Sequence, residues 1–277
     1  MKNKKYYKAF NPDMTCRGKQ YAENTVYEES GADGCCQAGV MHFCENPFDC
    51  LNYYPLVNEN GDISQFAEVE PQDEVIHRGD KCATKKLKIC ARLGLKGLVE
   101  ATINFTAERA ESNTGGYGAR IASGGAGAQI ASGADDAQIA SGADGAQIAS
   151  NGYDARIASS GYGARIASGG DGAQIASGGY GARIASSGYG ARIASSGYGA
   201  RIASGADDAR IASGGKDAVV AAVGRNSNIK AELGSWIVLA EYDKNSIPLC
   251  VKSAQIDGEK LKPGILYTLK NGEFVEV

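Results

Sequence analysis

Isoleucine recurs every nine residues through the middle of the chain, each time within Ala-(Arg/Gln)-Ile-Ala-Ser followed by a glycine-containing turn. The eleven isoleucines are Ile121, Ile130, Ile139, Ile148, Ile157, Ile166, Ile175, Ile184, Ile193, Ile202 and Ile211. A fixed short period indicates one supersecondary unit stacked many times. The segment between glycines is too short to nucleate a helix, so each unit is predicted to be a short strand and a tight turn.

Side chains alternate across a strand, so Ala155, Ile157 and Ser159 are expected to point inward, while Arg156 and Ala158 point outward. One isoleucine between two small residues fills only a narrow interior. We therefore predict a two-sided β-solenoid of about 18 residues per coil; a three-sided coil of about 27 residues is the alternative. Strands stack about 4.8 Å apart, so eleven units would give about five to six coils spanning on the order of 25 Å.

In a two-sided coil, alternate units share a face. One face would carry Arg120, Gln138, Arg156, Gln174, Arg192 and Arg210, and the other Gln129, Gln147, Arg165, Arg183 and Arg201. We interpret these rows either as a binding surface or as a soluble face that blocks sheet-to-sheet aggregation. The candidate interaction surface consists of Arg156, Arg165, Arg183, Arg192, Arg201, Tyr162, Tyr180, Tyr189 and Tyr198. The turn tyrosines could instead only cover the turn backbone.

The charge balance and the residues at the motif positions of the repeat argue against several kinds of ligand. Between Gly115 and Gly215, seven Arg stand against seven Asp, and the whole chain has a net charge of −3, which argues against nucleic-acid binding. Calcium-binding rolls of the same period need Asp where this repeat holds Arg or Gln, so calcium is not expected. The outward threonine rows of ice-binding solenoids are missing from the repeat.

The flanks have ordinary composition and divide the chain into three parts: an α+β domain (1–112), the solenoid (113–228) and a β-hairpin cap (229–277). Strands are predicted at 5–10, 40–44, 66–70 and 81–90. Asn46-Pro47 is typical of a helix start. Residues 93–110 are predicted to form a helix that docks on the first coil. Asp257-Gly258 and Asn271-Gly272 predict hairpin turns.

The N-terminal flank contains the candidate ligand-binding residues Arg17, Tyr21, His42, Glu68 and Glu70. It also contains Cys35, Cys36, His42, Cys44 and Cys50 within sixteen residues, but not at standard zinc-knuckle spacing. We interpret these cysteines as reduced, buried thiols, and we expect neither a metal nor a cofactor. The sequence shows neither an export signal nor a membrane span, which favours a cytoplasmic protein.

Both flanks resemble an uncharacterised family of phage and prophage proteins. The resemblance is carried by KAFNPDMTCRGKQY (8–21), HFCENPFDCLNYYP (42–55), FAEVE (66–70) and DGEKLKPGILYTLKNGEFVEV (257–277). Val40-Met41 replaces the Gly-Phe that usually precedes the histidine of this family. The resemblance implies a gene of a bacterial virus and action in the host cytoplasm or on a virion. It transfers no catalytic residue.

Three functions remain open. The first is a non-enzymatic interaction protein, a rigid solenoid carrying a binding module for a protein partner such as a bacterial defence component. The second is an enzyme: the N-terminal element order is loosely similar to ADP-ribosyltransferase-like domains, which would make Glu68 or Glu70 the acid that holds the nicotinamide ribose. The third is a virion structural or decorating protein, for which a homo-oligomer is expected.

Overall fold

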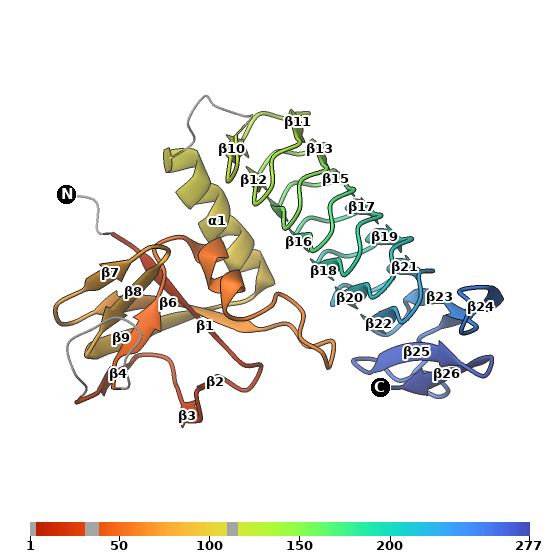
Figure 1. Cartoon of the computed structure of the whole chain (residues 1–277), viewed down its shortest axis with the longest axis horizontal. Coiled ribbons are helices and arrows are strands. Elements are labelled where there is room, and N and C mark those ends of the chain that lie inside the picture. Colours follow the sequence, from red (N-terminus) through yellow and green to blue (C-terminus); the bar gives the residue numbers. More distant parts are fainter. Residues whose placement is uncertain (1–3, 31–38, 110–115) are drawn as a thin grey trace.

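The computed structural model describes residues 4–30, 39–109 and 116–277. The fold is mainly β, with a central solenoid of about seven turns over residues 120–239 and about 18 residues per turn. An N-terminal α+β part lies along one side of the solenoid, and hairpins follow its C-terminal end (Figure 1). Within these described ranges, no helix is both long and apolar enough to cross a membrane.

Two parallel sheets form the solenoid, which confirms the two-sided prediction. The first, named the covered sheet, contains β10 (Arg120–Ser123), β12 (Gln138–Ser141), β14 (Arg156–Ser159), β16 (Gln174–Ser177), β18 (Arg192–Ser195), β20 (Arg210–Ser213) and β22 (Asn228–Ala231). The second, named the open sheet, contains β11 (Gln129–Ser132), β13 (Gln147–Ser150), β15 (Arg165–Ser168), β17 (Arg183–Ser186), β19 (Arg201–Ser204), β21 (Val219–Ala222) and β23 (Trp236–Tyr242).

The interior is a column of isoleucines in exact register from coil to coil, as the pairing of Ile139 with Ile157 and of Ile157 with Ile175 shows. The side chains of Ile139, Ile157 and Ile175 are fully buried, and each contributes about 1.5–3 kcal/mol by leaving water. The eleven regular units account for the predicted five to six coils, and the solenoid continues beyond them to about seven turns. Three degenerate units, around Val220, Ile229 and Ile237, keep an inward apolar residue and therefore continue the sheets.

Aspartates in the turns join successive coils. The Asp135 carboxylate accepts a hydrogen bond from the backbone N–H of Tyr153, one coil later, at 2.9 Å, and Asp171 accepts one from Tyr189 at 2.8 Å. The same contact links Asp144 with Tyr162. Much of the acidic charge of the repeat therefore satisfies turn amides, a structural role.

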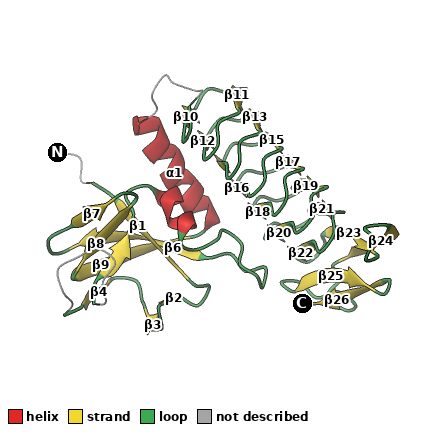
Figure 2. Cartoon of the chain, viewed as in Figure 1, coloured by secondary structure: helices red, strands yellow, loops and turns green. Residues whose placement is uncertain are grey.

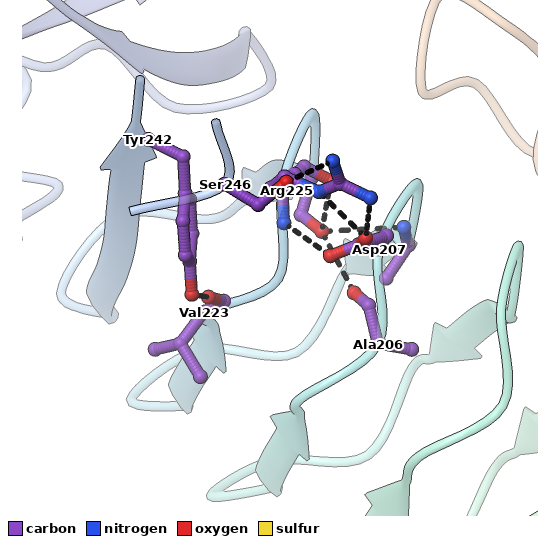
Figure 3. Close-up of polar contacts among 8 residues, drawn as sticks. Ala206, Asp207, Val223, Arg225, Tyr242 and Ser246 are labelled. Atoms are coloured by element: carbon purple, nitrogen blue, oxygen red, sulfur yellow. Dashed lines mark hydrogen bonds and ion pairs between the residues drawn. The ribbon is translucent and has the colours of Figure 1, made fainter. Parts of the chain in front are cut away.

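Figure 3 shows the last such contact, where Asp207 meets Arg225. Asp207 accepts from the backbone N–H of Arg225 at 2.8 Å and from its guanidinium at 2.6 and 2.8 Å. The guanidinium also donates to the Ser246 hydroxyl, and the Tyr242 hydroxyl donates to the carbonyl of Val223. These contacts fasten the loop after β23 to the final turns of the solenoid.

The N-terminal part holds three small sheets and two helical segments among its described residues. Its elements are β1 (Tyr6–Phe10), β2 (Thr15–Cys16), β3 (Lys19–Gln20), β4 (Thr25–Glu28), β5 (Met41–Phe43), the 3-10 helix η1 (Pro47–Asn52), β6 (Gln65–Pro71), β7 (Ile76–Arg78), β8 (Lys81–Thr84), β9 (Lys86–Leu93) and α1 (Leu95–Arg109). The strands pair in the orders β1-β6-β9-β4, β5-β8-β7 and β2-β3. Asn46 caps η1 by accepting from the Phe48 N–H, as predicted.

Helix α1 lies between the N-terminal sheets and the solenoid (Figure 2). It contacts β10, which confirms the prediction that it docks on the first coil, and it extends further along the covered sheet to β12, β14 and β16. Leu98 and Val99 pack with Ala158, Ala176 and Ala194 of the covered sheet in one buried cluster. The outward alanine column gives a shallow surface across several coils, and a helix can approach this surface closely.

The C-terminal strands β24 (Pro248–Gln255), β25 (Leu266–Lys270) and β26 (Glu273–Glu276) extend the two sheets in antiparallel fashion. Asn271 and Gly272 adopt positive φ values of 52° and 70° between β25 and β26, which confirms that hairpin. The hairpin predicted at Asp257-Gly258 was wrong. The Asp257 carboxylate instead accepts from the amides of residues 259–261, in a loop that passes from the open sheet to the covered sheet.

Candidate functional site

Two of the five arginines proposed as an interaction surface, Arg156 and Arg192, lie on the covered sheet, and the structure contradicts the prediction for the buried Arg156. Arg156 is 7% exposed; its guanidinium donates to the Asn52 side chain and lies 3.8 Å from the Asp49 carboxylate. Arg192 is partly covered, and burial, followed by repulsion from Arg210, lowers its pKa. The N-terminal part of the same chain packs on the covered sheet, so this sheet leaves little surface for a partner.

Two glutamines of the covered sheet also form hydrogen bonds with the N-terminal part. The Gln138 side-chain oxygen accepts from Asn46 at 2.6 Å, and the Gln138 amide donates to Asp49 at 3.2 Å. The Gln174 oxygen accepts from the backbone N–H of Leu56 at 3.1 Å. Gln138, Arg156 and Gln174, on three successive strands of this row, therefore each have a polar partner in the N-terminal part.

The open sheet exposes its outward residues. Arg165, Arg183 and Arg201 pair in register on adjacent strands, and all three are exposed. They line a groove of about 1070 Å³ whose floor is the outward alanine column. None of the three guanidinium groups forms an ion pair or hydrogen bond with another residue that the structure describes.

Three of the four candidate tyrosines stack beside this arginine row. The rings of Tyr162 and Tyr180 lie 5.2 Å apart and 4° from parallel, and those of Tyr180 and Tyr198 lie 5.2 Å apart and 15° from parallel. A groove of about 490 Å³ runs between the tyrosines and the arginines. Tyr189 lies in a turn that leads from the open to the covered sheet, which is the opposite edge of the coil.

Arg17, Tyr21 and His42 line one pocket of about 330 Å³ in the N-terminal part. Arg17 stands at the tip of the β2–β3 hairpin with φ 50°. Lys8, Lys19 and Lys81 also line the pocket, and Lys19 pairs with the pocket residue Glu29. The excess of cationic groups suits the pocket to an anionic group.

Burial and the neighbouring positive charges lower the pKa of the histidine in this pocket. Burial, followed by the charges of Arg17, Lys8 and Lys81, lowers the pKa of His42 to about 4. Lys8 is 5% exposed, and its ammonium donates to the carbonyl of His42 at 2.9 Å and lies 5.5 Å from the centre of the Tyr21 ring. His42 is therefore neutral at neutral pH.

Glu68 and Glu70 do not join this pocket. Glu68 pairs with Tyr7 across β1 and β6, so its side chain projects on the sheet face opposite to that of Lys8. It forms an ion pair with Lys5 at 3.0 Å and lines a separate groove with α1 residues. Glu70 lies two residues further along β6, so its side chain projects on the same face as that of Glu68, and it is exposed.

The cysteine cluster is only partly described, because Cys35 and Cys36 lie outside the described residues. Cys44 and Cys50 are buried, and the hydrogen bond with Cys50 raises the pKa of Cys44. A different group was missed at the sequence level: the ligand atoms of Glu45, His77 and Cys82 lie within 4.8 Å of one another. His77 and Cys82 pair directly across the hairpin that β7 and β8 form. Recognising that hairpin in the sequence would have placed them together.

In the comparison with known proteins, only the N-terminal part matches a family model. No curated protein and no solved structure matches the chain. A family model described as a domain of unknown function (DUF7666) matches residues 4–101. These residues span the N-terminal sheets, η1 and the first half of α1, and the solenoid lies outside the match.

Proposed function

We propose that this protein is a non-enzymatic interaction protein whose solenoid presents the open sheet to an acidic segment of a partner protein. One observation carries the proposal: Arg165, Arg183 and Arg201 form an exposed row in register, without an ion pair to any other described residue. The covered sheet is occupied by the N-terminal part, so the open sheet is the face that a partner can reach.

The chemistry of this face favours carboxylates. Adjacent arginines stand about 4.8 Å apart, so they repel one another until anions lie between them. Planar guanidinium groups bind carboxylates through paired hydrogen bonds. The stacked Tyr162, Tyr180 and Tyr198 add a rigid aromatic edge of the kind enriched at protein interfaces. An extended acidic segment along the solenoid axis would meet both rows.

Binding of an oligo-glutamate peptide tests this surface. The triple variant Arg165→Glu, Arg183→Glu, Arg201→Glu is expected to lose about tenfold or more in affinity at low salt. The matched control Lys244→Glu, Lys260→Glu, Lys262→Glu makes the same charge change at exposed residues of the C-terminal cap and should bind as the unchanged protein does. Equal binding by both triple variants, or a preference for duplex DNA over the peptide, would contradict the proposal.

The biological context rests on the resemblance of the flanks to phage and prophage proteins. On that basis we propose that the partner is a component of bacterial host defence met in the host cytoplasm. Capture from host lysate, compared between the unchanged protein and the triple arginine variant, checks this. A partner retained equally by both proteins would refute the role of the open sheet.

The two alternative hypotheses stay predictions. An ADP-ribosyltransferase-like enzyme would need Glu68 or Glu70 beside a nucleotide pocket, whereas both project away from the cationic pocket of Arg17 and His42. Binding of NAD at millimolar concentration would support the enzyme. A virion structural role is tested by light scattering, in which a trimer would favour it.

A further inference from the structure

The N-terminal part holds a compact group of three different ligand types. The Cys82 sulfur lies 3.3 Å from His77 Nδ1, and His77 Nδ1 lies 3.4 Å from Glu45 Oε1. All three ligand atoms lie within 4.8 Å of one another. They come from separate elements: Glu45 from the loop before η1, His77 from β7 and Cys82 from β8.

The sulfur–nitrogen and nitrogen–oxygen separations match two edges of a tetrahedral zinc site. Zinc binds carboxylate oxygen and histidine nitrogen at about 2.0–2.2 Å and cysteine sulfur at about 2.3 Å, so its ligand atoms stand about 3.3–3.8 Å apart. We propose that Glu45, His77 and Cys82 bind a zinc ion, with a water molecule as the fourth ligand. Nitrogen, sulfur and oxygen together suit zinc better than the hard cations magnesium or calcium, which prefer oxygen alone.

Strand pairing holds the three ligands in place before any ion arrives. Cys82 pairs directly with His77 in one hairpin and with Phe43 on the other side. Glu45 follows shortly after Phe43, and the bridge between Tyr7 and Cys44 fixes the chain between them. A preorganised site loses little conformational entropy on binding.

Lys4 competes for the same carboxylate. Its ammonium lies 2.5 Å from Glu45 Oε1, and this contact raises the pKa of Lys4. A zinc ion would replace the ammonium as the charge partner of Glu45. Replacing Lys4 is therefore expected to strengthen zinc binding. If Glu45 served only as the ion-pair partner of Lys4, replacing Lys4 would leave the zinc affinity unchanged.

Cobalt substitution tests the site on the reduced, metal-free full chain. One equivalent of Co²⁺ should produce the intense visible bands of a tetrahedral site and a thiolate-to-cobalt charge-transfer band, and Zn²⁺ should abolish both. His77→Gln and Glu45→Gln are expected to weaken Co²⁺ binding by about tenfold or more, and Lys4→Gln to strengthen it. Cys82→Ala should remove the charge-transfer band.

One control variant and the choice of an exposed ligand keep the test decisive. Cys90→Ala removes a half-buried thiol of β9 and should leave the band unchanged. Because Cys82 is buried, its replacement can unfold the domain, so the exposed His77 decides the outcome. Failure to bind Co²⁺ at millimolar concentration, or equal affinity of His77→Gln, Glu45→Gln and the unchanged protein, would overturn the proposal.

Discussion

Arginine at the outward position of the repeat occurs in two environments. Arg156 is buried against Asn52 and Asp49, whereas Arg165, nine residues later, is exposed. Burial raises the pKa of Asp49, and the charge of Arg156 opposes that rise. The same residue in the same motif is thus structural on one sheet and available to a partner on the other.

Replacement of Arg156 by Ala is expected to lower the free energy of unfolding by about 2 kcal/mol or more, because it leaves the Asp49 carboxylate buried without its cation. Arg165→Ala is the matched control and should change stability by about 0.5 kcal/mol or less. Urea unfolding measures both. The addition of Asp49→Asn to Arg156→Ala should recover part of the loss, and equal stability of the two arginine variants would contradict this account.

His42 should make stability depend on pH. Its pKa falls from 6.5 in the unfolded chain to about 4 in the folded protein, so the unfolded state binds the proton more readily. Its contribution is therefore fully present above about pH 6.5 and is lost as the pH falls towards about 4. As the pH falls across that interval, the unfolding free energy of the unchanged protein should fall relative to that of His42→Asn, so the difference between them should change. A constant difference would contradict the depressed pKa.

At the scale of the element, the turn decides whether coils can stack. A Cβ at Gly161 would lie 1.8 Å from the carbonyl oxygen of Ala143 in the preceding coil. At Gly205 a Cβ would meet no other atom within 4 Å, and the φ there is not positive. Two glycines of the same repeat therefore have different reasons to be present.

Gly161→Ala is expected to lower the melting temperature strongly, because backbone must move to remove the clash and overpacking costs about 1–3 kcal/mol or more. Gly205→Ala should be neutral or slightly stabilising, since alanine restricts the unfolded chain. Differential scanning calorimetry compares the two variants. Similar melting temperatures would show that the coil spacing can relax around the new methyl group.

At the scale of the whole molecule, the N-terminal part and the solenoid share one apolar cluster. Leu98 and Val99 of α1 meet the alanine column of the covered sheet, and Lys230 near the far end pairs with Asp62 at 2.5 Å. The contact runs along several coils, so we expect the two parts to unfold together.

Ala176→Glu should break this association, because it places a carboxylate without a cation in the buried contact, at a cost of several kcal/mol. Ala185→Glu makes the same change at an exposed position of the open sheet and should be tolerated. Limited proteolysis and the thiol reactivity of Cys44 and Cys50 would report detachment. Equal thiol protection in the two variants would contradict a shared cooperative unit.

Local pattern was sufficient for most elements of the fold. The cap at Asn46, the hairpin at Asn271-Gly272 and the inward isoleucines were predicted correctly, because each depends on residues close in sequence. Three of five candidate ligand residues meet in one pocket, but Glu68 and Glu70 project on the other sheet face. Their separation depends on strand order and register, which no short motif encodes.

The sequence by itself determined the solenoid, its coil of two strands and the two outward rows, since a nine-residue period combined with strand alternation permits few other arrangements. The tertiary structure alone decided which row is covered, which arginines remain exposed, and that Glu45, His77 and Cys82 meet. The physical reason is one of range. Alternation and turns are fixed by neighbours along the chain, whereas docking of α1 and η1 depends on apolar surfaces far apart in sequence.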